Sequence, residues 1–110
     1  MAQNKKDQFD QEITSLSDLA NAISHPARVA ILRKIAERQG CICGEIVEVL
    51  PLAQSTVSQH LKELLKANLI KGTVDGTKSC YCINWDAFSA FEKIFGTFFS
   101  GIAAHNISCC

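Results

Sequence analysis

The segment LAQSTVSQHLKELLKANLIKG, residues 52–72, constrains the fold more than any other part of the chain. Within it, Leu61, Leu64 and Leu65 recur at helical spacing and define one buried face of a helix. The start of the same helix carries small hydroxyl and amide side chains, which suit contacts to phosphates and base edges. An ordinary amphipathic surface helix is the alternative, but the polar first turn and the β-hairpin predicted directly after it favour a helix that reads DNA.

The remaining elements follow from apolar periodicity and from residues that end helices. In chain order we expect helices over residues 13–23 and from Pro26 to Gly40, a strand at 41–43, helices over 45–50 and 54–67, a hairpin turning at Asp75-Gly76, and a last helix capped by Asn84 or Asp86. This order predicts a mainly α fold with a small β-hairpin wing (α+β), a winged helix-turn-helix with one extra helix at each end. Residues 1–11 are predicted to be a flexible lead-in, 12–104 the domain, and 105–110 a cysteine-bearing tail.

Composition limits the classes of function. A chain of 110 residues with 47% hydrophobic residues forms one small domain with an adequate core. Its net charge of zero argues against a protein that coats nucleic acid by charge alone, although residues 54–80 carry four lysines against two acidic residues. We find no apolar run of transmembrane length and no hydrophobic signal core, so we expect a cytoplasmic protein without a membrane partner.

The two terminal helices carry apolar stripes that predict a homodimer. The last helix contains five phenylalanines, more apolar surface than so small a domain needs for its own core. A dimer would place two DNA-reading helices on successive major-groove faces of a two-fold symmetric operator. The alternative is that both stripes only cover the core of the monomer. The predicted interface residues are Leu16, Leu19, Ile23, Phe88, Phe91, Phe95, Phe98 and Phe99.

The segments SHPARVAILRKIAE and GEIVEVLPLAQSTVSQHLKELLKANLIKG, with a wing ending in YCIN, resemble the arsenic-repressor (ArsR/SmtB) family of bacterial winged-helix repressors over roughly residues 16–85. The resemblance implies a homodimeric transcriptional repressor, not an enzyme, that binds double-stranded operator DNA when empty and is released by a metal or metalloid. The DNA-contacting positions that it implies are Gln54, Ser55, Thr56, Ser58, Gln59, His60, Lys71 and Lys78.

The chemistry of these side chains separates their roles. Ser55 and Thr56 are better phosphate ligands, whereas Ser58 and Gln59 are suited to reading bases, and Lys62 adds a cation on an exposed face. His60 is either packed or phosphate-facing. The sequence departs from the family at two positions: Ala53 stands where relatives often have a Ser or Thr N-cap, and Asp75 replaces a basic residue at the wing tip.

The cysteines are grouped as C-x-C, C-x-C and C-C, which favours metal, metalloid or redox chemistry over isolated buried thiols. The family's best-known thiol site, a Cys-x-Cys at the start of its third helix, falls one residue away from Cys41 and Cys43, so these ligands do not transfer directly. In winged helices, however, the strand before the third helix pairs with the second wing strand. Cys80 and Cys82 would then lie beside Cys41 and Cys43, with Cβ atoms of opposed residues about 5 Å apart.

An all-sulfur ligand set selects soft ions. We therefore expect no constitutive cofactor and an inducer such as arsenite or antimonite, with Cd, Pb, Zn or Cu(I) as further possibilities. The predicted ligands are Cys43, Cys80 and Cys82, followed by Cys41, Cys109 and Cys110. The alternative is a repressor switched by cysteine oxidation or persulfidation. A small thiol enzyme such as an arsenate reductase is a remote alternative, because no Arg or His adjoins its candidate, Cys43.

Overall fold

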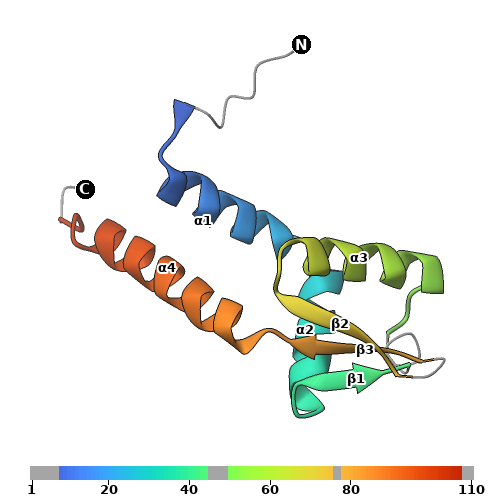
Figure 1. Cartoon of the computed structure of the whole chain (residues 1–110). Helices are drawn as coiled ribbons and strands as arrows, with labels where there is room; N and C mark the ends of the chain where they lie inside the picture. Colours follow the sequence, from blue (N-terminus) through green and yellow to red (C-terminus); the bar gives the residue numbers. More distant parts are fainter. Residues whose placement is uncertain (1–7, 45–49, 76–77, 108–110) are drawn as a thin grey trace.

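The computed structural model describes residues 8–44, 50–75 and 78–107 (Figure 1). Its elements are, in chain order, α1 (Gln11–Ala22), α2 (Pro26–Glu37), β1 (Cys41–Cys43), α3 (Gln54–Lys66), β2 (Ile70–Asp75), β3 (Lys78–Ile83) and α4 (Trp85–Ala103). This order confirms the predicted winged helix-turn-helix with a helix added at each end. The brief helix predicted over residues 45–50 is not compared, because residues 45–49 lie outside the described ranges. In those ranges, no helix is both long and apolar enough to cross a membrane.

The three strands form an antiparallel sheet in the order β1-β3-β2, with one face against α2 and α3 (Figure 1). Alternate residues of a strand point to opposite faces, so Ile42, Tyr81 and Ile83 share the inner face. Each fully buried aliphatic side chain contributes about 1.5–3 kcal/mol to folding. The most deeply buried core residues come from the two helices and the start of the wing: Ile31, Ile35, Val57, Leu64, Leu69 and Ile70.

Helix ends are set by local chemistry. The His25 Nδ1 accepts a hydrogen bond from the Ala27 N–H at 3.0 Å and caps α2, whose first residue is Pro26. Beyond α2, Gly40 has φ +92°, and a Cβ atom there would lie 3.0 Å from the Trp85 indole. The positive φ favours glycine at this position, and any larger residue would also have to displace the Trp85 ring.

A hydrogen bond joins the end of α3 to the start of α4. Ala53 provides no side-chain cap for α3, as the sequence predicts, and Asn68 ends that helix in the left-handed region with φ +68°. The Asn84 Oδ1 caps α4 by accepting from the Ala87 N–H at 3.2 Å. The Asn84 Nδ2 also donates to the Asn68 carbonyl oxygen at 3.0 Å. Asn84 thus connects the end of the wing to the end of α3.

The helix α4 extends away from the half of the molecule formed by α2, α3 and the sheet (Figure 1). The radius of gyration is 17.0 Å, whereas a compact chain of this length has about 13 Å. None of the 19 residues of α4 is buried in the single chain. Apolar periodicity in the second predicted helix places Val29 and Ala36 on the inner face with Ile31 and Ile35, and this prediction is wrong, since both are exposed on α2.

Candidate nucleic-acid interface and cysteine cluster

One face of α3 anchors the helix and the other is open to solvent. Val57, Leu61 and Leu64 are at most 4% exposed and fix the helix against α2 and the sheet. The solvent face carries most of the side chains that the sequence assigns to DNA: Gln54, Ser55, Thr56, Ser58, Gln59 and Lys62, all exposed. A rigidly held helix with exposed amides and hydroxyls is suited to insertion into a major groove.

His60 does not belong to this surface. Its ring is buried, with 9% exposure, and its Nδ1 accepts a hydrogen bond from the Arg28 Nε at 3.2 Å. The His25 ring lies against it with a centroid distance of 4.4 Å. His60 is therefore packed against the start of α2, and its assignment as a DNA contact stays a prediction.

The role of Arg28 is not apparent from the sequence. This side chain is half-buried and donates through Nη1 to the Asn21 and Ala22 carbonyl oxygens at 3.2 and 3.3 Å. Together with its bond to His60, these contacts tie the end of α1 to α3. Little in the sequence indicates these contacts, because arginine side chains on a helix are usually exposed to solvent.

Burial lowers the pKa of His60 below its usual value, and the positive charges of His25 and Arg28 lower it further, against a smaller opposite effect of Glu63. The unfolded chain therefore binds a proton more readily than the folded chain does. We expect the free energy of unfolding to be constant above about pH 6.5 for this site and to fall as the pH decreases below it. Urea unfolding between pH 5 and pH 7.5 measures this slope. It should be reduced in His60→Gln and unchanged in His105→Gln, which alters an exposed histidine.

The wing supplies two of the predicted DNA contacts. Lys71 is exposed in β2, directly opposite Cys82 on β3. Lys78 begins β3 near the hairpin turn, but its side chain lies outside the described residues, as does that of Asp75. The assignment of these lysines to DNA stays a prediction.

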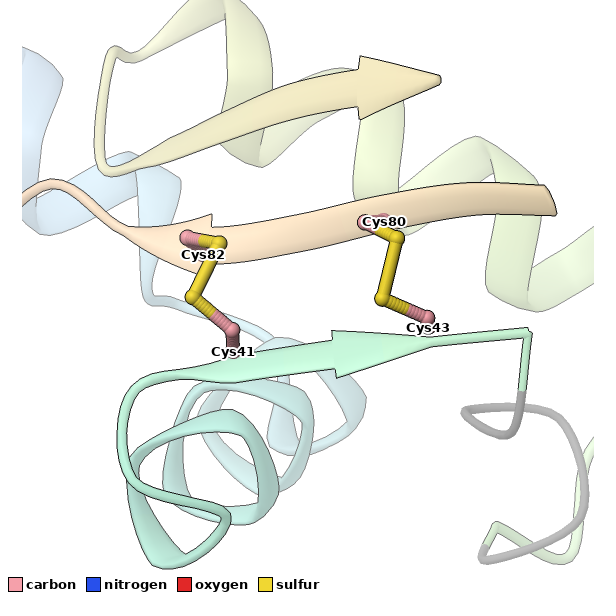
Figure 2. Close-up of a disulfide and its surroundings, with 4 residues drawn as sticks. All are labelled: Cys41, Cys43, Cys80 and Cys82. Atoms are coloured by element: carbon pink, nitrogen blue, oxygen red, sulfur yellow. A yellow bond between two sulfur atoms is a disulfide. The ribbon is translucent and has the colours of Figure 1, made fainter. Parts of the chain in front are cut away.

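The four strand cysteines lie as the sequence geometry predicts. β1 pairs with β3 in a register that places Cys41 opposite Cys82 and Cys43 opposite Cys80. Both pairs are disulfides, with Cα atoms 4.0 Å apart in each, and Figure 2 shows them side by side across the two strands. Cys109 and Cys110 lie outside the described residues, so their predicted part as ligands is not compared.

We call the side of the sheet that carries these disulfides the outer face, made up of Cys41, Cys43, Cys80, Cys82, Lys71 and Thr73. The strand registers arrange it in two rows: Cys41, Cys82 and Lys71 form one, and Cys43, Cys80 and Thr73 form the other. In the described part of the chain, no group of three His, Cys, Asp or Glu side chains is placed to hold a metal ion while the disulfides are closed. A soft ion would need the thiols in reduced form.

The predicted dimer residues fall into two groups. Leu19, Ile23, Phe88 and Phe91 pack partly against the core of their own chain. Leu16 and Phe98 instead line an open groove of about 470 Å³ between α1 and α4. The rings continue along α4 with centroid distances of 4.4 Å for Phe91 and Phe95 and 6.1 Å for Phe95 and Phe99. Phe98, Phe99 and Ile102 are 43%, 61% and 60% exposed, so the far end of the stripe is uncovered.

Comparison with known proteins places this arrangement among transcription regulators. A family model described as a helix-turn-helix domain matches residues 23–73. The HTH-type transcriptional repressor SmtB of Mycobacterium tuberculosis is 35% identical over 69 residues, 63% of this chain and 50% of that protein, so the chain spans about half the length of this relative. An uncharacterized HTH-type transcriptional regulator of Methanocaldococcus jannaschii is 35% identical over 79 residues, 71% of this chain and 88% of the relative.

A solved structure agrees with the whole described fold. The solution structure of a homodimeric winged helix-turn-helix DNA-binding domain from Mycobacterium bovis, a possible ArsR-family transcriptional regulator, superposes with a TM-score of 0.63. The superposition covers 99% of this chain and 100% of that one at 21% identity. At this identity the likeness establishes the fold alone.

Proposed function

This chain belongs to the ArsR/SmtB family of winged helix-turn-helix regulators, and on that premise we propose that it is a homodimeric DNA-binding repressor controlled by its strand cysteines. The observation that carries the control is the register of β1 and β3, which opposes the four cysteines in two pairs. DNA binding itself is supported by the exposed polar face of α3 and by the repressor named among the relatives.

The proposed dimer uses the uncovered end of the aromatic stripe. Exposed Phe98, Phe99 and Ile102 on α4 continue the groove that α1 and α4 form together. The M. bovis domain of the same fold is homodimeric. Two copies joined there would present two α3 helices to a two-fold symmetric operator.

The proposed input is oxidation of the thiols. In each pair, two thiols and one peroxide give one disulfide and two waters, so closing both pairs consumes two peroxides. The strand β3 connects the disulfides to the DNA-reading helix. Asn84 follows β3 and donates a hydrogen bond to the Asn68 carbonyl oxygen at the end of α3. Locking β1 to β3 therefore restrains both the DNA-reading helix and the start of the dimerisation helix.

Binding of a soft metalloid is the second candidate, and the same register favours it. Reduced, the four sulfurs would lie on one face of two adjacent strands, which suits three thiolates around As(III) or Sb(III), or four around Cd, Pb or Zn. Both candidates need the same thiols, so oxidation would prevent metalloid binding. They differ in whether the released protein carries disulfides or a bound ion.

The test measures DNA affinity in three states of one protein: reduced with chelator, peroxide-oxidised, and reduced with arsenite. The probe is a labelled duplex obtained by in vitro selection on the reduced protein, followed by fluorescence anisotropy. We expect a tenfold or larger loss of affinity, at least about 1.4 kcal/mol, in the oxidised state. The variant with both Cys80→Ser and Cys82→Ser should bind like the reduced protein under all conditions.

The matched control carries Cys109→Ser and Cys110→Ser, which removes the same number of thiols and should keep the response. Loss of affinity with arsenite but not with peroxide would replace oxidation by metalloid binding as the input. Equal affinity in all three states would refute control by the cysteines, while leaving the protein a DNA-binding repressor.

A further inference from the structure

The two cysteine pairs differ in access to solvent. Cys41 is exposed on the edge strand β1, and its partner Cys82 is half-buried. In the other pair, Cys43 is half-buried and Cys80 is only 6% exposed. Exchange and oxidation both need a reagent to reach sulfur, so the Cys41–Cys82 pair is the more accessible one.

The two pairs also differ in charge. Cys82 lies between Cys41 on one side and Lys71 on the other, because β3 is the central strand. Opposed residues of antiparallel strands have Cβ atoms about 4.5–5.5 Å apart, so the lysine stem starts beside the thiol. The corresponding neighbour of Cys80 is Thr73, which is neutral. A nearby cation stabilises a thiolate, and the thiolate is the reactive form.

We propose that Cys82 is the nucleophilic thiol of the outer face, that Cys41 resolves it, and that the Cys43–Cys80 pair reacts later. Lys71 is a positioning residue that favours the Cys82 thiolate. This inference rests on the proposed thiol control for its biological meaning, but it concerns the order of reaction and is tested without DNA.

The proposed oxidation by peroxide needs only the two thiols of one pair. The Cys82 thiolate attacks the peroxide O–O bond and gives a Cys82 sulfenic acid and hydroxide. The Cys41 thiol then attacks the Cys82 sulfur, and the S–O bond breaks. The product is the Cys41–Cys82 disulfide and water, the sulfenic oxygen taking up the proton of Cys41. The two sulfurs lose two electrons, which the peroxide accepts. In reverse, a dithiol reductant opens this bond at the exposed Cys41 sulfur and leaves Cys82 as the departing thiolate.

The experiment follows each pair separately by timed alkylation and peptide mass spectrometry on the whole chain with chelator present. Reduced protein receives hydrogen peroxide and oxidised protein receives dithiothreitol. We expect the Cys41–Cys82 pair to close and to open first, at least about tenfold faster than Cys43–Cys80 at pH 7. Earlier reaction of Cys43–Cys80 in either direction would overturn the order proposed.

The lysine is tested by Lys71→Met, with Lys34→Met as a control that removes the same charge from α2. Loss of the cation leaves less Cys82 thiolate at pH 7, and the greater nucleophilicity of the more basic thiolate offsets this loss only in part. We therefore expect Lys71→Met to slow oxidation of Cys82 about threefold at pH 7 and to shift its pH–rate profile to higher pH. Equal profiles for Lys71→Met and Lys34→Met would refute the positioning role.

These outcomes are independent of the proposed function. If the cysteines react in the expected order but DNA affinity is equal in both redox states, thiol control of the repressor fails and the reactivity of Cys82 stands. If DNA affinity responds but Cys43–Cys80 reacts first, the control stands and this inference fails.

Discussion

Phe99→Asp in α4 is expected to convert the proposed dimer into a monomer and to lower the affinity for the proposed two-fold operator by about 10²- to 10⁴-fold. Phe99 is 61% exposed in the single chain, so an aspartate there leaves the core of the monomer intact. In a dimer the same position would bury a carboxylate against apolar rings, which costs several kcal/mol. Without the second copy, each half-site must be bound separately, and the gain from linking two α3 helices is lost.

Sedimentation equilibrium and anisotropy with a full operator duplex check this result, and a half-site duplex completes the comparison. The half-site affinity should be nearly equal for Phe99→Asp and the wild type. Ser100→Asp is the matched control, because Ser100 is exposed one residue along α4 on the side away from the aromatic stripe. A monomer from both variants would point to helix destabilisation instead, and a dimeric Phe99→Asp protein would rule out this face as the interface.

The order of elements was predictable because each boundary has a local cause. Pro26, Gly40, Asn68 and Asn84 act through backbone dihedrals or caps that depend on a few neighbouring residues. The pairing of β1 with β3 was predictable from the resemblance, since the two C-x-C segments must be neighbours in a winged helix. Local rules and one topological rule were sufficient for the fold.

The contacts of Arg28 and His60 were not predictable in the same way. They are 32 positions apart, and whether each faces solvent depends on how α2 crosses α3. Helical periodicity leaves residues at the edge of an apolar stripe undecided, so His60 could be assigned to either face. The difference in environment between Cys82 and Cys80 was unpredictable for the same reason, because it depends on which β2 residue lies opposite each of them.

The DNA-contacting residues of α3 were predictable only in part. Sequence periodicity predicted the exposed side chains, and the structure leaves them exposed around a buried anchor of Val57, Leu61 and Leu64. Which of them reads a base depends on the docking of two copies on a bent or straight duplex, which a single chain does not determine.

Reduction of both disulfides is expected to lower the free energy of unfolding by about 6 kcal/mol, whereas removal of either one alone should cost about 2 kcal/mol. Each bridge closes a loop of similar length, with sequence separations of 41 and 37, and such a loop restricts the unfolded chain by about 3–4.7 kcal/mol. The bridges are nested, Cys43–Cys80 within Cys41–Cys82. Once one is closed, the other closes only the few residues between them, and this short loop restricts the unfolded chain by a further ~2 kcal/mol.

Urea unfolding at one fixed protein concentration, with chelator to exclude metal, compares four species: the oxidised and the reduced protein, and the oxidised variants Cys41→Ala/Cys82→Ala and Cys43→Ala/Cys80→Ala. The two variants should lie about 2 kcal/mol below the oxidised protein, because one long loop is still closed in each. If each variant lost as much as full reduction does, the bridges would act on the native sheet rather than on the unfolded chain. If reduction changed stability by less than 1 kcal/mol, the reduced chain would have to keep β1 and β3 together in the unfolded state. A stable reduced protein is also what a reversible switch requires, so the size of this loss bounds how far oxidation can serve as a signal.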